Sequence, residues 1–116
     1  MTNITFRTRY GHIYQVTSEN HTSYDSPGYD IVCSAISALM ITTANGLTSV
    51  ARIPDVEIKT DPASGYMFIG VPRIGMEPRD QIKSDLLLET LEKGLMAVEE
   101  GYFENVDIQW IADDQE

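Results

Sequence analysis

The chain has 116 residues and carries 18 acidic residues against 8 basic ones, which gives a formal net charge of −10. This length provides for one domain, residues 1–116, with a single hydrophobic core. The acidic excess, with no cluster of Lys or Arg, argues against nucleic-acid binding and favours encounter with a basic protein or peptide, unless the charge serves only solubility.

Cysteine and histidine are scarce: the chain has one cysteine, Cys33, and two histidines, His12 and His21. One cysteine cannot form an internal disulfide, and a Cys-His metal site normally needs four ligands, so we expect no metal and no other cofactor. A free thiol fits a reducing, cytoplasmic setting. We expect no membrane association, because the N-terminus is too polar for a signal peptide and the apolar runs are judged too short to span a bilayer.

The first elements are predicted to form a β-hairpin. Residues 3–9 alternate apolar and polar side chains as a half-buried strand does, and residues 12–20 form a second such segment. Tyr10-Gly11 between them predicts the turn.

A helix is predicted over residues 31–45, where apolar residues recur at helical spacing. Asp30 stands where an N-cap is expected, and Asn45-Gly46 is a typical helix stop. Cys33 is therefore expected in the first helical turn.

A second hairpin is predicted from residues 55–61 and 65–72, joined by a turn at Pro62-Ala63-Ser64-Gly65. A long amphipathic helix then begins at Glu77-Pro78 and ends near Gly101. The stripe of this helix predicted to face the core consists of Ile82, Leu86, Leu87, Leu91, Leu95 and Val98. Residues 105–111 are the last predicted strand, and the acidic end, residues 112–116, is expected to fray.

The order β-β-α-β-β-α-β predicts a two-layer α+β domain, in which a mostly antiparallel sheet carries both helices on one face. The second helix has Leu87 and Leu88 in addition to its main stripe. Because one small layer cannot cover all of this apolar surface, we expect a homodimer.

Cys33 and His21 are a candidate chemical pair. Unpaired N–H groups and the positive end of the dipole at a helix start favour a thiolate, although the carboxylate of Asp30 would oppose this if it lay close to the sulfur. Residues 22–29 have the composition of a loop, which we expect to be mobile and to close over a substrate. Such a loop can bring His21 beside the thiol as a general base.

Simpler interpretations remain open at this point. A lone cysteine in a helix is usually a small buried hydrophobe, and a loop histidine is usually solvated. Ile36 and Ser37 lie one turn after Cys33, which places the thiol at the edge of the buried stripe. A thiol redox function is disfavoured because the chain has no second cysteine to resolve a disulfide.

This segment resembles the ribosomal-processing cysteine protease family, Prp. The family pattern is a histidine, a short loop and Gly-x-Asp-x-x-Cys-x-x-x-Ser, with the histidine twelve residues before the cysteine, and His21, Gly28, Asp30, Cys33 and Ser37 fill those positions. The resemblance continues through residues 42–47, TTANGL. It does not include His12, which is twenty-one residues from Cys33 and is expected to be a hairpin residue.

The chain departs from the family pattern beside His21 and beside Cys33. Where the family usually has Gly-His-Ala and Cys-Ala-Ala, this chain has Asn20-His21-Thr22 and Cys33-Ser34-Ala35. Glycine tolerates backbone conformations that asparagine adopts less readily, so Asn20 bears on the geometry at the end of the strand.

The resemblance implies a homodimeric cysteine endopeptidase that removes the N-terminal extension of a large-subunit ribosomal protein precursor through a thioester. It implies that Cys33 is the nucleophile and His21 the proton carrier, with Asp30 capping the helix and Ser37 supporting the thiol. A second hypothesis is a catalytically inactive, dimeric protein-binding module of the same fold, in which the changes at Asn20 and Ser34 have removed the activity.

Overall fold

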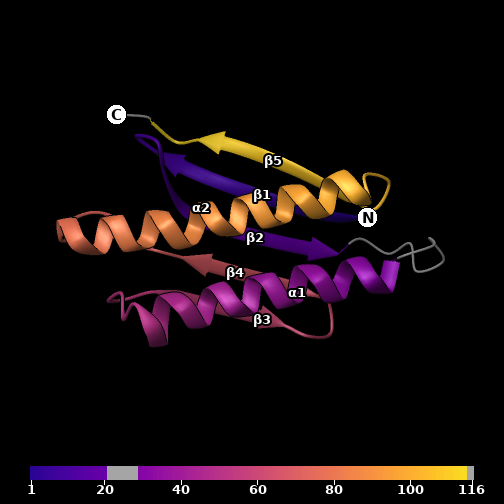
Figure 1. Ribbon diagram of the computed structural model, residues 1–116, viewed down its shortest axis with the longest axis horizontal. Coiled ribbons are helices and arrows are strands. Elements are labelled where there is room, and N and C mark those ends of the chain that lie inside the picture. The colour runs from indigo at the N-terminus through magenta and orange to yellow at the C-terminus, as the bar shows by residue number, and fades with distance from the viewer. Residues whose placement is uncertain (21–28, 115–116) are drawn as a thin grey trace.

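The computed structural model describes residues 1–20 and 29–114. In chain order the elements are β1 (Thr2–Arg9), β2 (His12–Asn20), α1 (Tyr29–Asn45), a π-helical turn η1 (Gly46–Val50), β3 (Glu57–Asp61), β4 (Tyr66–Gly70), α2 (Pro78–Gly101) and β5 (Val106–Ala112). The strands form one sheet in the order β3-β4-β2-β1-β5, and both helices cover the same face of it (Figure 1). The predicted α+β class, two layers and element order are confirmed.

The sheet is mostly antiparallel, as predicted. β2 pairs antiparallel with β1 and β4, and β3 with β4, whereas β5 runs parallel to β1 at the edge. The first hairpin turn has positive φ angles at both central residues, Tyr10 (50°) and Gly11 (81°), which is the turn geometry that fits the twist of two paired strands. The register shifts between Arg7 and Thr8, so the pair contains a bulge close to the turn.

The core lies between the sheet and the two helices. Side chains alternate across each strand, so Ile4 and Phe6 of β1 and Val16 of β2 point toward the helices and are fully buried. The remaining buried apolar residues of this cluster are Ile13, Val32, Ile36, Met40, Ala44, Leu47, Ile53, Ile69, Val71, Leu88, Leu91, Leu95, Val106 and Ile108. One contiguous cluster fits the single predicted domain.

The first helix, α1, begins two residues earlier than predicted and ends at Asn45, as predicted. It begins at Tyr29, whose side chain is buried, because packing of this ring extends the helix toward the N-terminus. Beyond Asn45, which keeps helical angles, the chain continues as the π-helical turn η1. A Cβ on Gly46 would lie 3.3 Å from Leu87 Cδ2 of α2, so this glycine permits the close approach of η1 and α2.

The combined helix Tyr29–Val50 is long and apolar enough to cross a membrane by length and composition alone, so the expectation that no such run exists is wrong. In the fold, Val32, Ile36 and Met40 of this helix are buried in the core. A core helix that packs in this way meets the same length and composition test as a membrane span.

The bounds of α2 agree with the prediction, and so does most of its buried stripe. Leu91 and Leu95 are buried, and Leu87 and Val98 pack against the core, as predicted. Ile82 (61% exposed) and Leu86 (65% exposed) were wrongly included, and Ser84 and Leu88 are buried in addition. Leu87 approaches Gly46 of η1, and Leu88 belongs to the buried core.

The C-terminal end is not frayed through Asp114, contrary to the prediction. Asp113 N–H donates to Thr8 O (2.8 Å), and Tyr10 N–H donates to a carboxylate oxygen of Asp114 (2.6 Å). The Asp113 carboxylate also pairs with Arg7. These bonds hold the end of β5 against the first hairpin.

The stripe of α2 can be tested with two leucines that are two residues apart. Leu88→Ala removes a fully buried side chain and is expected to lower the free energy of unfolding by about 2–5 kcal/mol. Leu86→Ala is the matched control, and at a protein concentration at which the chain is monomeric it is expected within about 0.5 kcal/mol of the parent, because the side chain is exposed in the single chain. Urea denaturation followed by circular dichroism measures both, and equal losses would contradict the observed stripe.

Candidate functional site

Cys33 lies near the start of α1, two residues further into the helix than predicted. It is the fifth helical residue, its side chain is half-buried, and it is a free thiol. Val32 and Ile36 on either side of it are buried, while Ser37, one turn on, is exposed. Cys33 therefore lies at the edge of the buried stripe, as the periodicity indicates, and not at its centre.

Asp30 is the second residue of α1 and is exposed, so it is not the N-cap that the sequence predicts. The earlier helix start at Tyr29 moves Asp30 inside the first turn. In that position its negative charge is favourable with the positive end of the helix dipole.

His21 and Gly28 fall in residues 21–28, outside the described residues, as does most of the expected lid, residues 22–29. The His21–Cys33 geometry is therefore a prediction that no distance tests. The described residues on either side are Asn20, which ends β2, and Tyr29, which begins α1. Figure 1 shows the end of β2 and the start of α1 at the same end of the molecule.

Asn20, the departure next to His21, has regular strand geometry. It pairs with Thr2 across the β1–β2 ladder, and Thr2 Oγ1 donates a hydrogen bond to Asn20 Oδ1 (2.9 Å). The non-glycine residues with positive φ in the described chain are Tyr10, Arg52 and Asp55, so the backbone at Asn20 does not require glycine. Ser34, the second departure, is exposed on α1.

The turn between β3 and β4 packs against this strand end, which the sequence gives no signal for. Gly65 has φ of 73°, and a Cβ at Gly65 would overlap the side-chain amide of Asn20. Only glycine permits both the backbone angle and the close approach. Gly65 is therefore a residue that shapes this end of the molecule.

The end of the molecule where α1 begins is acidic. Glu19 precedes Asn20 in β2. Asp61 is close to Gly65, because its main-chain carbonyl oxygen accepts a hydrogen bond from Gly65 N–H (2.9 Å). Glu104 precedes Asn105, whose carbonyl oxygen accepts a hydrogen bond from Thr2 N–H (2.8 Å). With Asp30, these carboxylates give the surface around the start of α1 a negative potential.

His12 is a hairpin residue, as predicted, at the opposite end of β2 from Asn20. Its Nδ1 lies 2.9 and 3.1 Å from the two carboxylate oxygens of Asp85 on α2. The Nη2 of Arg73 donates to the same carboxylate (2.8 Å). The described histidine thus belongs to an ion-pair network distant from Cys33.

This network borders a cavity of about 880 Å³ beside the first hairpin, which the sequence analysis does not anticipate. Arg7 and Arg9 of the first hairpin line it together with Arg73, which is more than sixty residues further along the chain. Among residues 1–20 and 29–114, no group of three or more His, Cys, Asp or Glu side chains is arranged to hold a metal ion.

The chain matches a known protein family over most of its length. The family model described as "Cysteine protease Prp" matches residues 1–107. A Staphylococcus aureus protein named ribosomal processing cysteine protease Prp is 28% identical over 103 residues, which are 86% of this chain and 89% of that protein.

Solved structures have the same fold. A Streptococcus mutans protein superposes with a TM-score of 0.83 at 29% identity, covering 97% of this chain and 96% of its own. The essential ribosomal processing protease Prp of S. aureus, crystallised with a substrate peptide, has a TM-score of 0.80 at 22% identity, covering 95% of this chain and 99% of that one.

The half-buried position of Cys33 predicts a thiol that reagents reach in the folded protein. Iodoacetamide at pH 7 is expected to add one carbamidomethyl group per chain without denaturant, and Cys33→Ser is expected to add none. Intact-mass spectrometry follows the reaction. Labelling that occurs only in urea would show that Cys33 is a buried core residue instead.

Proposed function

Because the chain belongs to the cysteine protease Prp family, a family of peptide hydrolases, we propose that it removes the N-terminal extension of a large-subunit ribosomal protein precursor. The observation that carries this proposal is the family match over residues 1–107, which includes an accessible thiol near the start of a helix. The substrate peptide bound to the S. aureus protease of the same fold supports a peptide substrate here.

In the proposed mechanism, His21 takes the proton of the Cys33 thiol, and the sulfur attacks the carbonyl carbon of the scissile peptide bond. The tetrahedral intermediate collapses to a thioester as His21 gives the proton to the leaving amine. Water then attacks the thioester with His21 again as base, which releases the new carboxylate and restores the thiol. Support for this pair comes from the motif spacing and from the shared end of β2 and α1.

The start of α1 offers groups that complement this chemistry. The first backbone N–H groups of a helix have no partner within it, and they are proposed to stabilise the oxyanion of the tetrahedral intermediate. Asp30 is proposed to stabilise the helix start through the dipole. Ser37 lies one turn after Cys33 on the same side of α1, where it can support the thiol.

The charge around this end suits a basic substrate. Glu19, Asp30, Asp61 and Glu104 lie around the approach to α1. Opposite charges raise the rate at which a basic ribosomal precursor meets the enzyme, and this contribution weakens as salt is added. The alternative of an inactive binding module supposes that Asn20 has removed the activity. Asn20 keeps regular strand geometry in β2, which argues against that alternative.

The dyad is tested by three substitutions and one cleavage assay. Cys33→Ser and His21→Ala are each expected to abolish cleavage of an N-terminally extended ribosomal protein, because loss of general base catalysis alone costs about 10² to 10⁴ in rate. His12→Ala is the matched control, expected to retain activity because its ring lies at the far end of β2. Product is measured by mass spectrometry.

Two outcomes of this assay would overturn parts of the proposal. Equal cleavage by the parent and His21→Ala would remove His21 from the mechanism. No cleavage by the parent, together with tight binding of the precursor by both the parent and Cys33→Ser, would establish the binding module.

We also propose that the chain is a homodimer, with a contact surface that differs from the one expected from sequence. Leu88 is fully buried and Leu87 packs against the core, so neither is free to face a partner. The exposed apolar side chains on the helices include Ile82 and Leu86 of α2, Ile41 of α1 and Val50 of η1, which we propose as the contact surface. Burying them against a second copy would remove them from water.

Sedimentation equilibrium at micromolar concentration is expected to give twice the chain mass. Leu86→Glu is expected to shift the protein toward the monomer, because a charge would be buried in the contact. Leu86→Ala serves as the control for loss of the side chain alone. A monomer mass for the parent would end the claim.

A further inference from the structure

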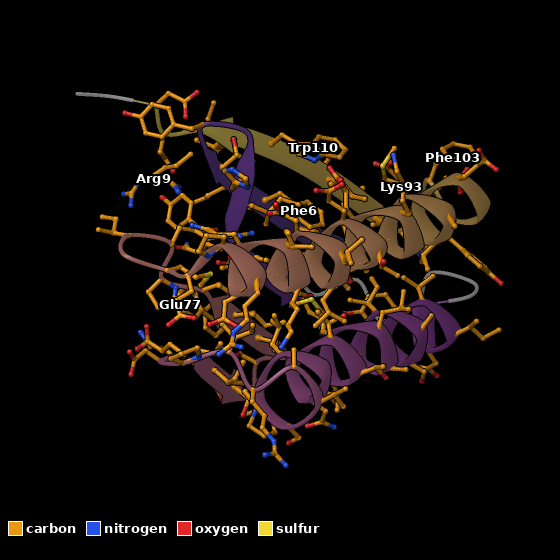
Figure 2. All side chains as sticks on the ribbon, turned by 60° about the vertical axis from the view of Figure 1, so that its left-hand side comes forward. Phe6, Arg9, Glu77, Lys93, Phe103 and Trp110 are labelled. Atoms are coloured by element: carbon orange, nitrogen blue, oxygen red, sulfur yellow. The ribbon has the colours of Figure 1, made fainter. Side chains whose placement is uncertain are left out.

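The cavity beside the first hairpin gathers three arginines in an acidic protein. Its lining includes Arg7, Arg9 and Arg73, three of the eight basic residues of the chain, together with His12 and the carboxylate of Asp113. Arg7 is paired with Asp113 and Arg73 with Asp85, so Arg9 is the one of these three arginines without a direct ion pair among the described residues. Figure 2 shows Arg9 at the opposite end of the molecule from Phe103, which follows α2 near the start of α1. The cavity is thus separate from Cys33 and its surroundings.

One wall of the cavity already binds a carboxylate. Arg7 donates from Nε and Nη2 to the two oxygens of Asp113 (2.8 and 3.0 Å), and the Tyr14 hydroxyl donates to the same group (2.6 Å). The hydrogen bonds from Arg7, and then from Tyr14, lower the pKa of Asp113. Arg7 thus binds the carboxylate in a bidentate manner, with one hydrogen bond to each oxygen.

A second wall is held rigidly by Arg73, whose side chain is only 8% exposed. Its guanidinium donates to Ile13 O (2.7 and 3.1 Å), to Gln81 Oε1 (2.7 Å) and to Asp85 (2.8 Å). Asp85 in turn fixes the ring of His12. These bonds order the polar side of the cavity before any ligand enters, which reduces the entropy lost on binding.

Arg9 differs from the other two arginines. Its guanidinium carbon lies 4.3 Å from the centre of the Tyr14 ring, and its charge acts on Asp113 without a direct ion pair to any carboxylate among residues 1–20 and 29–114. It is exposed at the cavity, next to Tyr10, which is 75% exposed. A charged donor stacked on an aromatic ring, with no carboxylate of the described chain hydrogen-bonded to it, is suited to receive an external anion.

The other side of the cavity is apolar. Tyr10 and Pro72 line it together with Ile74, which is 90% exposed, an unusual position for a branched apolar side chain. A volume of about 880 Å³ falls within the range of small-molecule sites.

From these features we propose that this cavity binds a small molecule in which a planar ring carries one anionic group, a phosphate or a carboxylate. The anion is placed at Arg9 and the ring against Tyr10 and Ile74. Nucleoside monophosphates and aromatic carboxylic acids share this chemistry. The proposal does not depend on the peptidase function, because the cavity contains neither Cys33 nor any residue of its helix.

Isothermal titration calorimetry on the full chain at low salt tests this proposal with four probes: adenosine 5′-monophosphate, 4-hydroxyphenylacetate, adenosine and inorganic phosphate. At least one of the first two is expected to bind, and the probe that binds more tightly identifies the source. Adenosine lacks the anionic group and inorganic phosphate lacks the ring. Each is therefore expected to bind at least about tenfold more weakly than the tighter-binding of the two anionic ring compounds.

Arg9→Gln is expected to weaken binding by about tenfold or more, whereas Lys93→Gln, an equal charge change on the exposed face of α2, is expected to leave it unchanged. Thermal unfolding establishes that both variants fold. Amide NMR shifts on titration are expected at Tyr10, His12 and Ile74. The proposal is overturned if neither anionic probe binds, if adenosine or phosphate alone binds as tightly, if the two variants behave alike, or if the shifts lie elsewhere.

Discussion

The sheet has one apolar face, and two helices must cover it. Ile4, Phe6 and Val16 supply the centre of that face, and burial of these side chains is the dominant favourable term in folding. Because α1 and α2 share one side, they pack against each other, and the close contact of Gly46 with Leu87 sets how near they can lie. The position of α1, and with it that of Cys33, depends on this packing.

The same constraint separates the molecule into two ends with different chemistry. At one end, β2 stops and α1, which carries Cys33, begins (Figure 1). At the other end, the first hairpin, the loop before α2 and the end of β5 come together and form a cavity with three arginines. The fold therefore brings together arginines from separate parts of the sequence at this end of the molecule.

Much of the fold follows from local patterns. The turn at Tyr10-Gly11, the second strand at residues 12–20 and the bounds of α2 agree with the structure because their signals are short-range: a turn dipeptide, a two-residue alternation and a proline at the helix start. Two details were wrong: Ile82 and Leu86 were placed on the buried stripe of α2, and the start of α1 was placed two residues too late. Both depend on which neighbour packs against the helix, and the apolar pattern of the sequence does not specify that neighbour.

For the candidate site, the sequence by itself determined the residue types, their spacing and the family, because the motif from His21 to Ser37 is contiguous along the chain. The tertiary structure decided where the helix starts, and so moved Asp30 from the cap into the first turn and Cys33 into the second. It also decided the cavity, whose arginines are as far apart as residues 7 and 73. Such groups meet only through the pairing of strands and the packing of helices, and those long-range contacts have no local signature in the sequence.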